Sequence, residues 1–210
     1  MTEKKDKKKS GRSLLYEVCR VLAWLLLHTI LPVRYEHLER IQGDAPFIMI
    51  GNHLSNMDPI IAALAVKRYQ IHFLAKKELG KVQIANWFLT KLHTIFVDRH
   101  NSDMEAMRAC MKVVRGGGVL GIFPEGTRHH EGLMEEIESG VALIALRSGV
   151  PLIPVYIQGK LRLFRKLDVL IGEPIPLDDL REEGVNAETC QKLMDRITQT
   201  YAEMAKLKKK

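Results

Sequence analysis

Residues 47–59 read FIMIGNHLSNMDP, which is a short apolar run followed by a polar turn and the start of a helix. Residues 47–50 are typical of a buried strand, because they are apolar and uncharged. Asp58 and Pro59 suit the N-cap and the first turn of a helix, since aspartate accepts hydrogen bonds from free backbone N–H groups and proline has no N–H to satisfy. His53 is then expected on the turn between strand and helix.

His53 and Asp58 offer a base with a carboxylate that could orient it. On one continuous helix, residues five apart point roughly 140° away from each other, so they would not meet. A turn lets the imidazole curl back toward the carboxylate, which would hold one ring nitrogen protonated and leave the other free to accept a proton. The alternative is that Asp58 only caps its helix and His53 is an ordinary loop residue.

Apolar strand-like runs alternate with helical patterns along the middle of the chain. The runs are residues 47–50, 71–75, 95–97, 119–123, 152–157 and 169–171. Ser102 and Glu105 form a capping-box pair before a helix that stops at Gly116, and a helix over residues 140–148 stops at Gly149. This alternation predicts a single α/β domain with a mostly buried mixed sheet flanked by helices.

Polar groups follow four of the predicted strands, and in open sheets ligands gather at strand ends. His53 follows the first strand, Lys76 the second, Arg99 the third and residues 124–128 the fourth. Lys76, Arg99 and Arg128 could bind a phosphate, the arginines through a forked contact. The alternative for each is a surface ion pair.

Three further residues of the fourth segment could contact a ligand. Gly126 lets the backbone approach closely, and the Thr127 hydroxyl can donate or accept a hydrogen bond. Glu125 could accept from a hydroxyl or orient an arginine. The alternative for each is an ordinary turn residue.

The composition and net charge indicate which classes of binding partner the chain has. The 210 residues carry a net charge of +7, with 46% hydrophobic and 27% charged residues, which suits one globular domain with anionic partners such as phosphate ligands or a membrane surface. Nucleic acid fits less well, because no zinc-finger or RNP-type motif occurs and aromatics are 6%. Cys19, Cys110 and Cys190 suggest neither a disulfide framework nor a metal cluster, so a reducing, cytosol-facing location is expected.

The N-terminal region combines a basic tail, residues 1–12, with an apolar segment, residues 13–33. On a helix, one narrow stripe of this segment would carry Ser13, Glu17, Arg20, Trp24 and His28. The wide apolar remainder predicts an amphipathic, membrane-associated helix that lies in the bilayer interface, aided by the preceding lysines. The alternatives are a helix buried against the domain and a single membrane span, although the longest uncharged stretch, residues 21–33, is shorter than the ~20 residues that a span needs.

The C-terminal region shows helical spacing of apolar residues from Cys190 to Met204, which predicts a face docked on the core. Residues 206–210 form a basic tail. The main domain is therefore expected over residues 34–205.

Four ordered segments together resemble the motifs of the glycerolipid acyltransferase family, whose bacterial members acylate 1-acyl-glycerol-3-phosphate. The segments are residues 52–59, 95–99, 123–128 and 150–155, and the resemblance covers roughly residues 33–173. Two residues depart from the family pattern: His93 stands where glycine is usual, and Glu138 where lysine is frequent.

The resemblance implies an acyltransferase domain in which His53 is the general base, assisted by Asp58. The acyl group would pass from acyl-CoA or acyl carrier protein to the free hydroxyl of lysophosphatidate, giving phosphatidic acid without a metal or cofactor. The acceptor's glycerol-phosphate is assigned to Glu125, Gly126, Thr127, Arg128, Arg99 and Lys76.

The expected location is the cytoplasmic face of the cell membrane, held peripherally or monotopically. Two alternatives remain: the same chemistry on another lysophospholipid or on glycerol-3-phosphate, and a non-catalytic peripheral lipid-binding module. The sequence leaves acyl-chain length, the choice of donor and the oligomeric state open.

Overall fold

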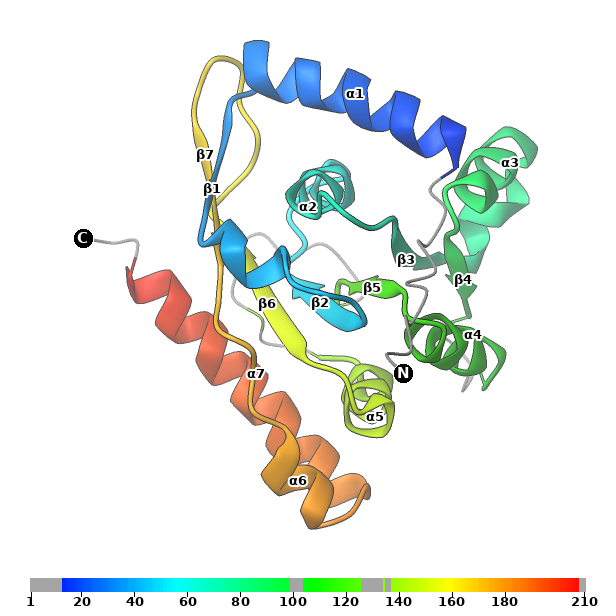
Figure 1. The fold of residues 1–210 in the computed structure, drawn as a ribbon, viewed down its shortest axis with the longest axis vertical. Coiled ribbons are helices and arrows are strands. Elements are labelled where there is room, and N and C mark those ends of the chain that lie inside the picture. Colours follow the sequence, from blue (N-terminus) through cyan, green and yellow to red (C-terminus); the bar gives the residue numbers. More distant parts are fainter. Residues whose placement is uncertain (1–12, 99–103, 126–133, 135–136, 208–210) are drawn as a thin grey trace, which may run out of the picture.

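The computed structural model describes residues 13–98, 104–125, 134 and 137–207. A seven-stranded sheet crosses the molecule in the order β1-β7-β6-β2-β5-β3-β4 (Figure 1). Its strands are β1 (Val33–Glu36), β2 (Phe47–Gly51), β3 (Ile71–Lys76), β4 (Ile95–Val97), β5 (Val119–Ile122), β6 (Leu152–Ile157) and β7 (Leu167–Ile171). All neighbours are parallel except β6 and β7, which confirms the predicted mixed sheet.

Helices cover both faces of the sheet. They are α1 (Leu14–Thr29), α2 (Asp58–Ala65), α3 (Gln83–Lys91), α4 (Met104–Arg115), α5 (Ser139–Ser148), α6 (Asp178–Glu182) and α7 (Ala187–Leu207), with 3-10 turns η1 (Leu38–Ile41) and η2 (Lys77–Lys81). Alternate residues of β2 face opposite ways: Ile48 and Ile50 pack with α4, α5, α6 and α7, whereas Phe47 and Met49 pack with α1, α2 and η1. Because both faces of β2 are buried, the strand is apolar throughout, as its sequence indicated.

Strand β1 was not predicted. Residues 33–36 were expected to end the apolar segment and begin the domain, but they form an edge strand parallel to β7. Arg34 gives the strand a charged appearance in the sequence, and its guanidinium binds Asp168 of β7 at 2.7 Å. An edge strand tolerates such charges because one of its sides faces solvent.

The two glycines predicted to stop helices directly follow the last residues of α4 and α5. Helix α4 stops at Arg115, directly before Gly116, although the proposed cap Ser102 lies outside the described residues. Helix α5 stops before Gly149, whose φ of 71° is the left-handed conformation that glycine adopts easily. Helix α7 buries the predicted face, including Leu193, Ile197 and Tyr201.

Helix α1 forms within the predicted apolar segment and lies across the domain next to α2 (Figure 1). Tyr16 and Leu27 are buried against the domain, and two members of the polar stripe secure the helix: Ser13 Oγ donates to the Lys91 carbonyl at 3.3 Å and Arg20 to the Lys67 carbonyl at 3.1 Å. Docking on the domain therefore occupies only one side of the helix.

The opposite side of α1 is apolar and exposed. Its exposed residues include Leu14, Val18, Val21, Leu22 and Leu25. Across residues 13–98, 104–125, 134 and 137–207, no helix has both the length and the apolar character needed to cross a membrane.

Candidate active site

The turn between β2 and α2 brings His53 against Asp58. His53 Nδ1 lies 3.0 Å from Asp58 Oδ2, which confirms the predicted contact. The same oxygen accepts from the backbone N–H groups of Leu54 and Ser55, each at 2.6 Å, and Oδ1 accepts from the Ser55 hydroxyl at 2.8 Å. Asp58 is 1% exposed, so its charge is compensated by these donors rather than by water.

Asp58 does not cap its own helix, contrary to the sequence prediction. It is the first residue of α2, which follows Met57, and its carboxylate turns back to the preceding turn. The Met57 carbonyl instead accepts from the N–H groups of Ile60 and Ile61. Pro59 stands in the first turn of the helix as predicted.

The carboxylate also determines which nitrogen of His53 can act as a base. Because an ionised carboxylate only accepts hydrogen bonds, Nδ1 carries the proton and Nε2 keeps its lone pair. The Phe123 ring packs against the imidazole at a centroid distance of 4.7 Å, and Phe73 stacks behind Phe123 at 6.0 Å. The imidazole is therefore held from the side as well as from Nδ1.

Two more buried side chains secure the His53 turn. Asn52, which is fully buried, donates to the Ile157 carbonyl at 2.9 Å and accepts from the Ile157 N–H at 2.7 Å. This pair extends the contact between β2 and β6 beyond Gly51 and Val155, the last two residues paired in the ladder. Glu125 approaches from the end of β5, where Oε2 accepts from the His53 N–H at 2.9 Å.

Tyr201 of α7 forms hydrogen bonds with the backbone of the two strands β2 and β6. Its hydroxyl donates to the Ile50 carbonyl at 2.7 Å and lies 3.3 Å from both the N–H and the carbonyl oxygen of Val155. Complete burial raises the pKa of Tyr201 well above its ordinary value, so the hydroxyl stays protonated as a donor. The C-terminal helix is thus joined to the strand that carries His53.

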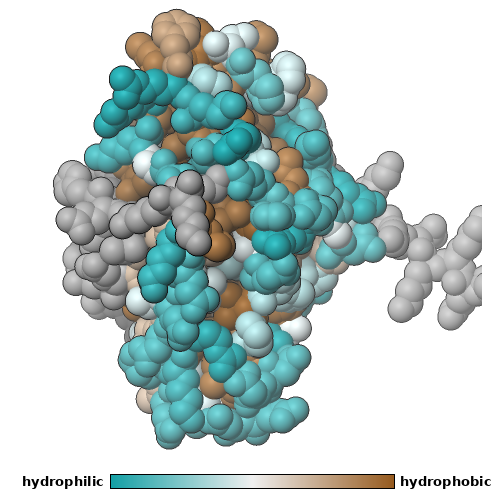
Figure 2. Space-filling model, turned by 90° about the vertical axis from the view of Figure 1, so that its left-hand side faces the viewer, coloured by the Kyte–Doolittle hydropathy of each residue, from teal (hydrophilic) through white to brown (hydrophobic). Residues whose placement is uncertain are grey.

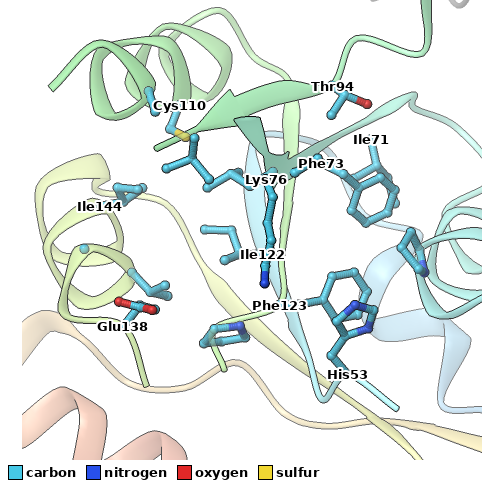
Figure 3. Close-up of a pocket in the computed structure, with 18 of the residues that line it drawn as sticks. His53, Ile71, Phe73, Lys76, Thr94, Cys110, Ile122, Phe123, Glu138 and Ile144 are labelled. Atoms are coloured by element: carbon cyan, nitrogen blue, oxygen red, sulfur yellow. The ribbon is translucent and has the colours of Figure 1, made fainter. Parts of the chain in front are cut away.

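A pocket of about 1680 Å³ opens beside His53. Figure 3 shows Lys76 reaching in from β3 toward the side where Phe123 and His53 lie, with Cys110 and Ile144 across the pocket. Away from His53 the wall is mostly apolar; it includes Leu74, Leu79, Phe88, Leu92, Met104, Met107, Val141 and Met194. Such a pocket joins one polar end to a long apolar interior, an arrangement that suits an amphipathic ligand.

The structure places four of the eight predicted site residues. His53, Asp58 and Glu125 meet at one turn, and exposed Lys76 lines the pocket. Glu125 is only 5% exposed and holds a backbone group, a contact that the sequence prediction of substrate binding did not include. Arg99, Gly126, Thr127 and Arg128 lie outside the described residues.

Both departures from the family pattern lie near the pocket. His93 has a φ of 60°, so a histidine adopts the left-handed conformation that glycine would take easily. Its ring stacks on His72 at 5.2 Å, and burial together with His93 lowers the pKa of His72. Glu138 lines the pocket opposite Lys76 and donates its N–H to the Pro124 carbonyl at 3.0 Å.

Sequence reasoning missed Asn52, Phe123 and Tyr201 as supports of the site. The available signal for Asn52 was a polar residue directly after an apolar strand, but its partner lies 105 residues away. Tyr201 is one apolar position among several on α7, and its bond to Ile50 spans 151 residues. Such long-range contacts become visible only when the sheet is assembled.

Comparison with known proteins gives consistent matches. An acyltransferase family model matches residues 32–158. A 1-acyl-sn-glycerol-3-phosphate acyltransferase of Bacillus subtilis is 31% identical over 166 residues, covering 77% of this chain and 82% of that protein. The corresponding enzyme of Streptococcus pneumoniae is 29% identical over 195 residues, covering 89% of this chain and 72% of that protein.

A solved structure is also similar. The crystal structure of PlsC from Thermotoga maritima, a 1-acyl-sn-glycerophosphate (LPA) acyltransferase, matches with a TM-score of 0.63 and 27% identity. The match covers 91% of this chain and 78% of that one. The segment matched by the family model contains His53, Asp58, Lys76 and Glu125.

Proposed function

Since the chain belongs to the acyltransferase family, we propose that it transfers a fatty acyl group to the free hydroxyl of 1-acyl-glycerol-3-phosphate, giving phosphatidic acid. The observation that carries the proposal is the oriented His53–Asp58 pair beside a large apolar pocket. A module that only binds lipid would need no such pair. The donor is a thioester of coenzyme A or of acyl carrier protein.

The reaction follows from the geometry of the pair. Nε2 of His53 takes the proton of the acceptor hydroxyl, and the oxygen attacks the thioester carbonyl carbon. The C–S bond then breaks, the new ester forms, and the thiolate takes the proton back from the imidazolium. Asp58 stabilises the imidazolium while it exists, because its carboxylate lies 3.0 Å from Nδ1. Protons and electron pairs balance without a metal, a cofactor or an acyl-enzyme.

The phosphate of the acceptor requires cations near the base. Lys76 supplies one from the end of β3, since it lines the same pocket as His53. Arg99 and Arg128, together with Gly126 and Thr127, complete the phosphate site in this proposal, on the strength of the motif resemblance. Glu125 is a positioning residue, because its carboxylate accepts a hydrogen bond from the backbone N–H of His53.

The apolar interior of the pocket is proposed to hold an acyl chain. Aliphatic and aromatic walls stabilise a hydrocarbon chain by removing its surface from water, at about 25 cal/mol per Å². The polar end beside His53 would then keep the reacting groups at the boundary between headgroup and chain.

We also propose that the enzyme works at the cytoplasmic face of the membrane. The exposed apolar side of α1 supports this location, because it would lie in the bilayer interface while the other side stays docked on the domain. A substrate dissolved in the same leaflet could then reach the pocket, which Tyr16, Cys19 and Ala23 of α1 also line.

The test is an acyl-transfer assay on the purified full chain in detergent. Lysophosphatidate, other lysophospholipids and glycerol-3-phosphate are each offered with acyl-CoA and with acyl carrier protein, and products are identified by mass. His53→Ala should lower kcat at least about 10²-fold, the lower range for removing a general base. The control is His37→Asn, which replaces an exposed histidine directly before η1 and should leave kcat unchanged. Normal turnover of the His53 variant would contradict the proposed mechanism.

A further inference from the structure

The connection between β6 and β7 has a distinctive composition. Its residues 160–166, here called the cationic loop, read KLRLFRK, so that four cations surround apolar residues. Leu163 and Phe164 form the exposed tip, with 65% and 77% of their surfaces open to solvent. Such exposed apolar side chains within a charged loop are costly in water unless something covers them.

The backbone holds this tip outward in a defined turn. Arg165 N–H donates to the Arg162 carbonyl at 3.2 Å, and the two residues form an isolated bridge. Phe164 has a φ of 55°, an uncommon conformation for a large side chain. Its own N–H donates to the Ile30 carbonyl just after α1 at 2.8 Å, which fastens the loop to the end of that helix.

The four cations of the cationic loop are exposed and available. They are Lys160, Arg162, Arg165 and Lys166. None of them forms an ion pair with another described residue. The nearby Arg34, in contrast, forms ion pairs with Asp168 and Glu36. The loop therefore presents unneutralised positive charge around an apolar tip.

The cationic loop continues the exposed apolar side of α1. Figure 1 shows the connection between β6 and β7 rising to the level of α1 at one end of the molecule. Figure 2 shows hydrophobic side chains gathered at the same end, above a band of hydrophilic ones. The contact between Phe164 and Ile30 makes the two surfaces contiguous.

We propose that the cationic loop is a second lipid-binding element, which inserts Leu163 and Phe164 into an anionic leaflet while its cations bind lipid phosphates. The inference rests on the membrane location proposed above and adds a contact that α1 alone does not supply. The apolar tip and its continuity with α1 fit a bilayer better than an acidic protein, which would meet the charges but leave the tip exposed. Two attachment points would fix the rotation of the domain on the surface.

The first experiment measures binding of the full chain to vesicles of phosphatidylcholine, with and without phosphatidylglycerol, by co-sedimentation. Arg162→Gln with Arg165→Gln should weaken binding to the anionic vesicles about 25-fold, from a factor of about 5 for each cation near the surface. The control, Lys112→Gln with Arg115→Gln, removes two exposed cations from α4 on the other face of the sheet and should have little effect. Equal binding by the wild type and the loop variant overturns the inference.

The second experiment uses tryptophan as a depth probe. The two tryptophans, Trp24 on α1 and Trp87 on α3, are replaced by phenylalanine, and Phe164→Trp is added. On anionic vesicles its emission should shift to the blue and be quenched by brominated lipid chains. Glu182→Trp in the same background is the control, because α6 lies at the opposite end of the molecule from α1 (Figure 1). An unshifted, unquenched Phe164→Trp signal on bound protein overturns the inference.

Two outcomes separate the loop from the proposed function. A wild-type chain that transfers acyl groups in detergent and binds neither vesicle overturns the membrane location and the loop's role together, but leaves the chemistry standing. Loop variants that bind vesicles normally and show a raised KM for acyl carrier protein alone identify a carrier-protein dock and overturn the lipid contact.

Discussion

Replacing Asp58 with asparagine removes the negative charge beside His53 and keeps the shape of the side chain. Oδ2 accepts from two backbone N–H groups, so the amide nitrogen cannot take that position without facing two donors. The amide oxygen must stay there and continue to accept from His53 Nδ1, and the amide nitrogen then faces the Ser55 hydroxyl, which can accept. Asp58→Asn should therefore preserve the tautomer of His53.

The size of the effect comes from the lost charge. An imidazolium and a carboxylate whose charge centres are roughly 4 Å apart attract by about 4 kcal/mol at the effective dielectric of such sites. The neutral amide retains a hydrogen bond worth about 1 kcal/mol. The difference of about 3 kcal/mol applies to the transition state, where the imidazolium forms, and predicts a fall in kcat of about 150-fold.

Steady-state kinetics in detergent measure this prediction, with thermal unfolding as a control for folding. The KM for lysophosphatidate should stay within about twofold, because Asp58 lies under the turn, 1% exposed, and does not line the pocket. A kcat within about threefold of the wild type would show that no imidazolium develops on His53. A loss beyond about 10⁴-fold would show that the wrong tautomer forms, which contradicts the two-donor geometry.

Three other substitutions test the supports of the site and the fold. Asn52→Ala leaves the Ile157 N–H without its side-chain partner, while the Ile157 carbonyl still accepts from the Gly159 N–H at 3.1 Å, and should lower the stability by about 2 kcal/mol, seen as a fall in Tm of roughly 4–8 °C. Gly121→Ala places a Cβ only 2.4 Å from Cε1 of the Phe73 ring and should cost about 1–3 kcal/mol in chemical denaturation; an unchanged midpoint would refute the clash. The hydrogen bond from Arg196 holds the pKa of Asp179 at about 2, below its ordinary 3.8. The pair therefore stabilises the fold above about pH 4, and the Tm difference between the wild type and Asp179→Asn should vanish as the pH falls toward 2.

The central strands were predictable because burial on both faces makes each one an apolar run. β2, β3, β4 and β6 begin at the predicted residues, and β5 differs only at its last residue. β1 was missed for the opposite reason: two of its four residues are charged, and its pairing with β7 depends on a segment more than 130 residues away.

In the site, too, the contact between residues close in the sequence was predictable and the rest was not. His53 and Asp58 are five residues apart, so a local pattern of strand, turn and helix start was enough to predict their contact. The same local view misassigned the Asp58 carboxylate as a helix cap, because it could not show that the Met57 carbonyl takes over the first N–H groups of α2. The family assignment drawn from four motifs is confirmed by the family model.

The bond between Tyr201 and Ile50 has a consequence for the order in which the protein matures. Domains fold as the ribosome extends them from the N-terminus, but this hydroxyl belongs to α7 and reaches back 151 residues to the strand before His53. A nascent chain that already contains every residue of the four motifs still lacks the support beneath them. Acyl transfer is therefore expected only after α7 has left the exit tunnel and docked on the strand that precedes His53.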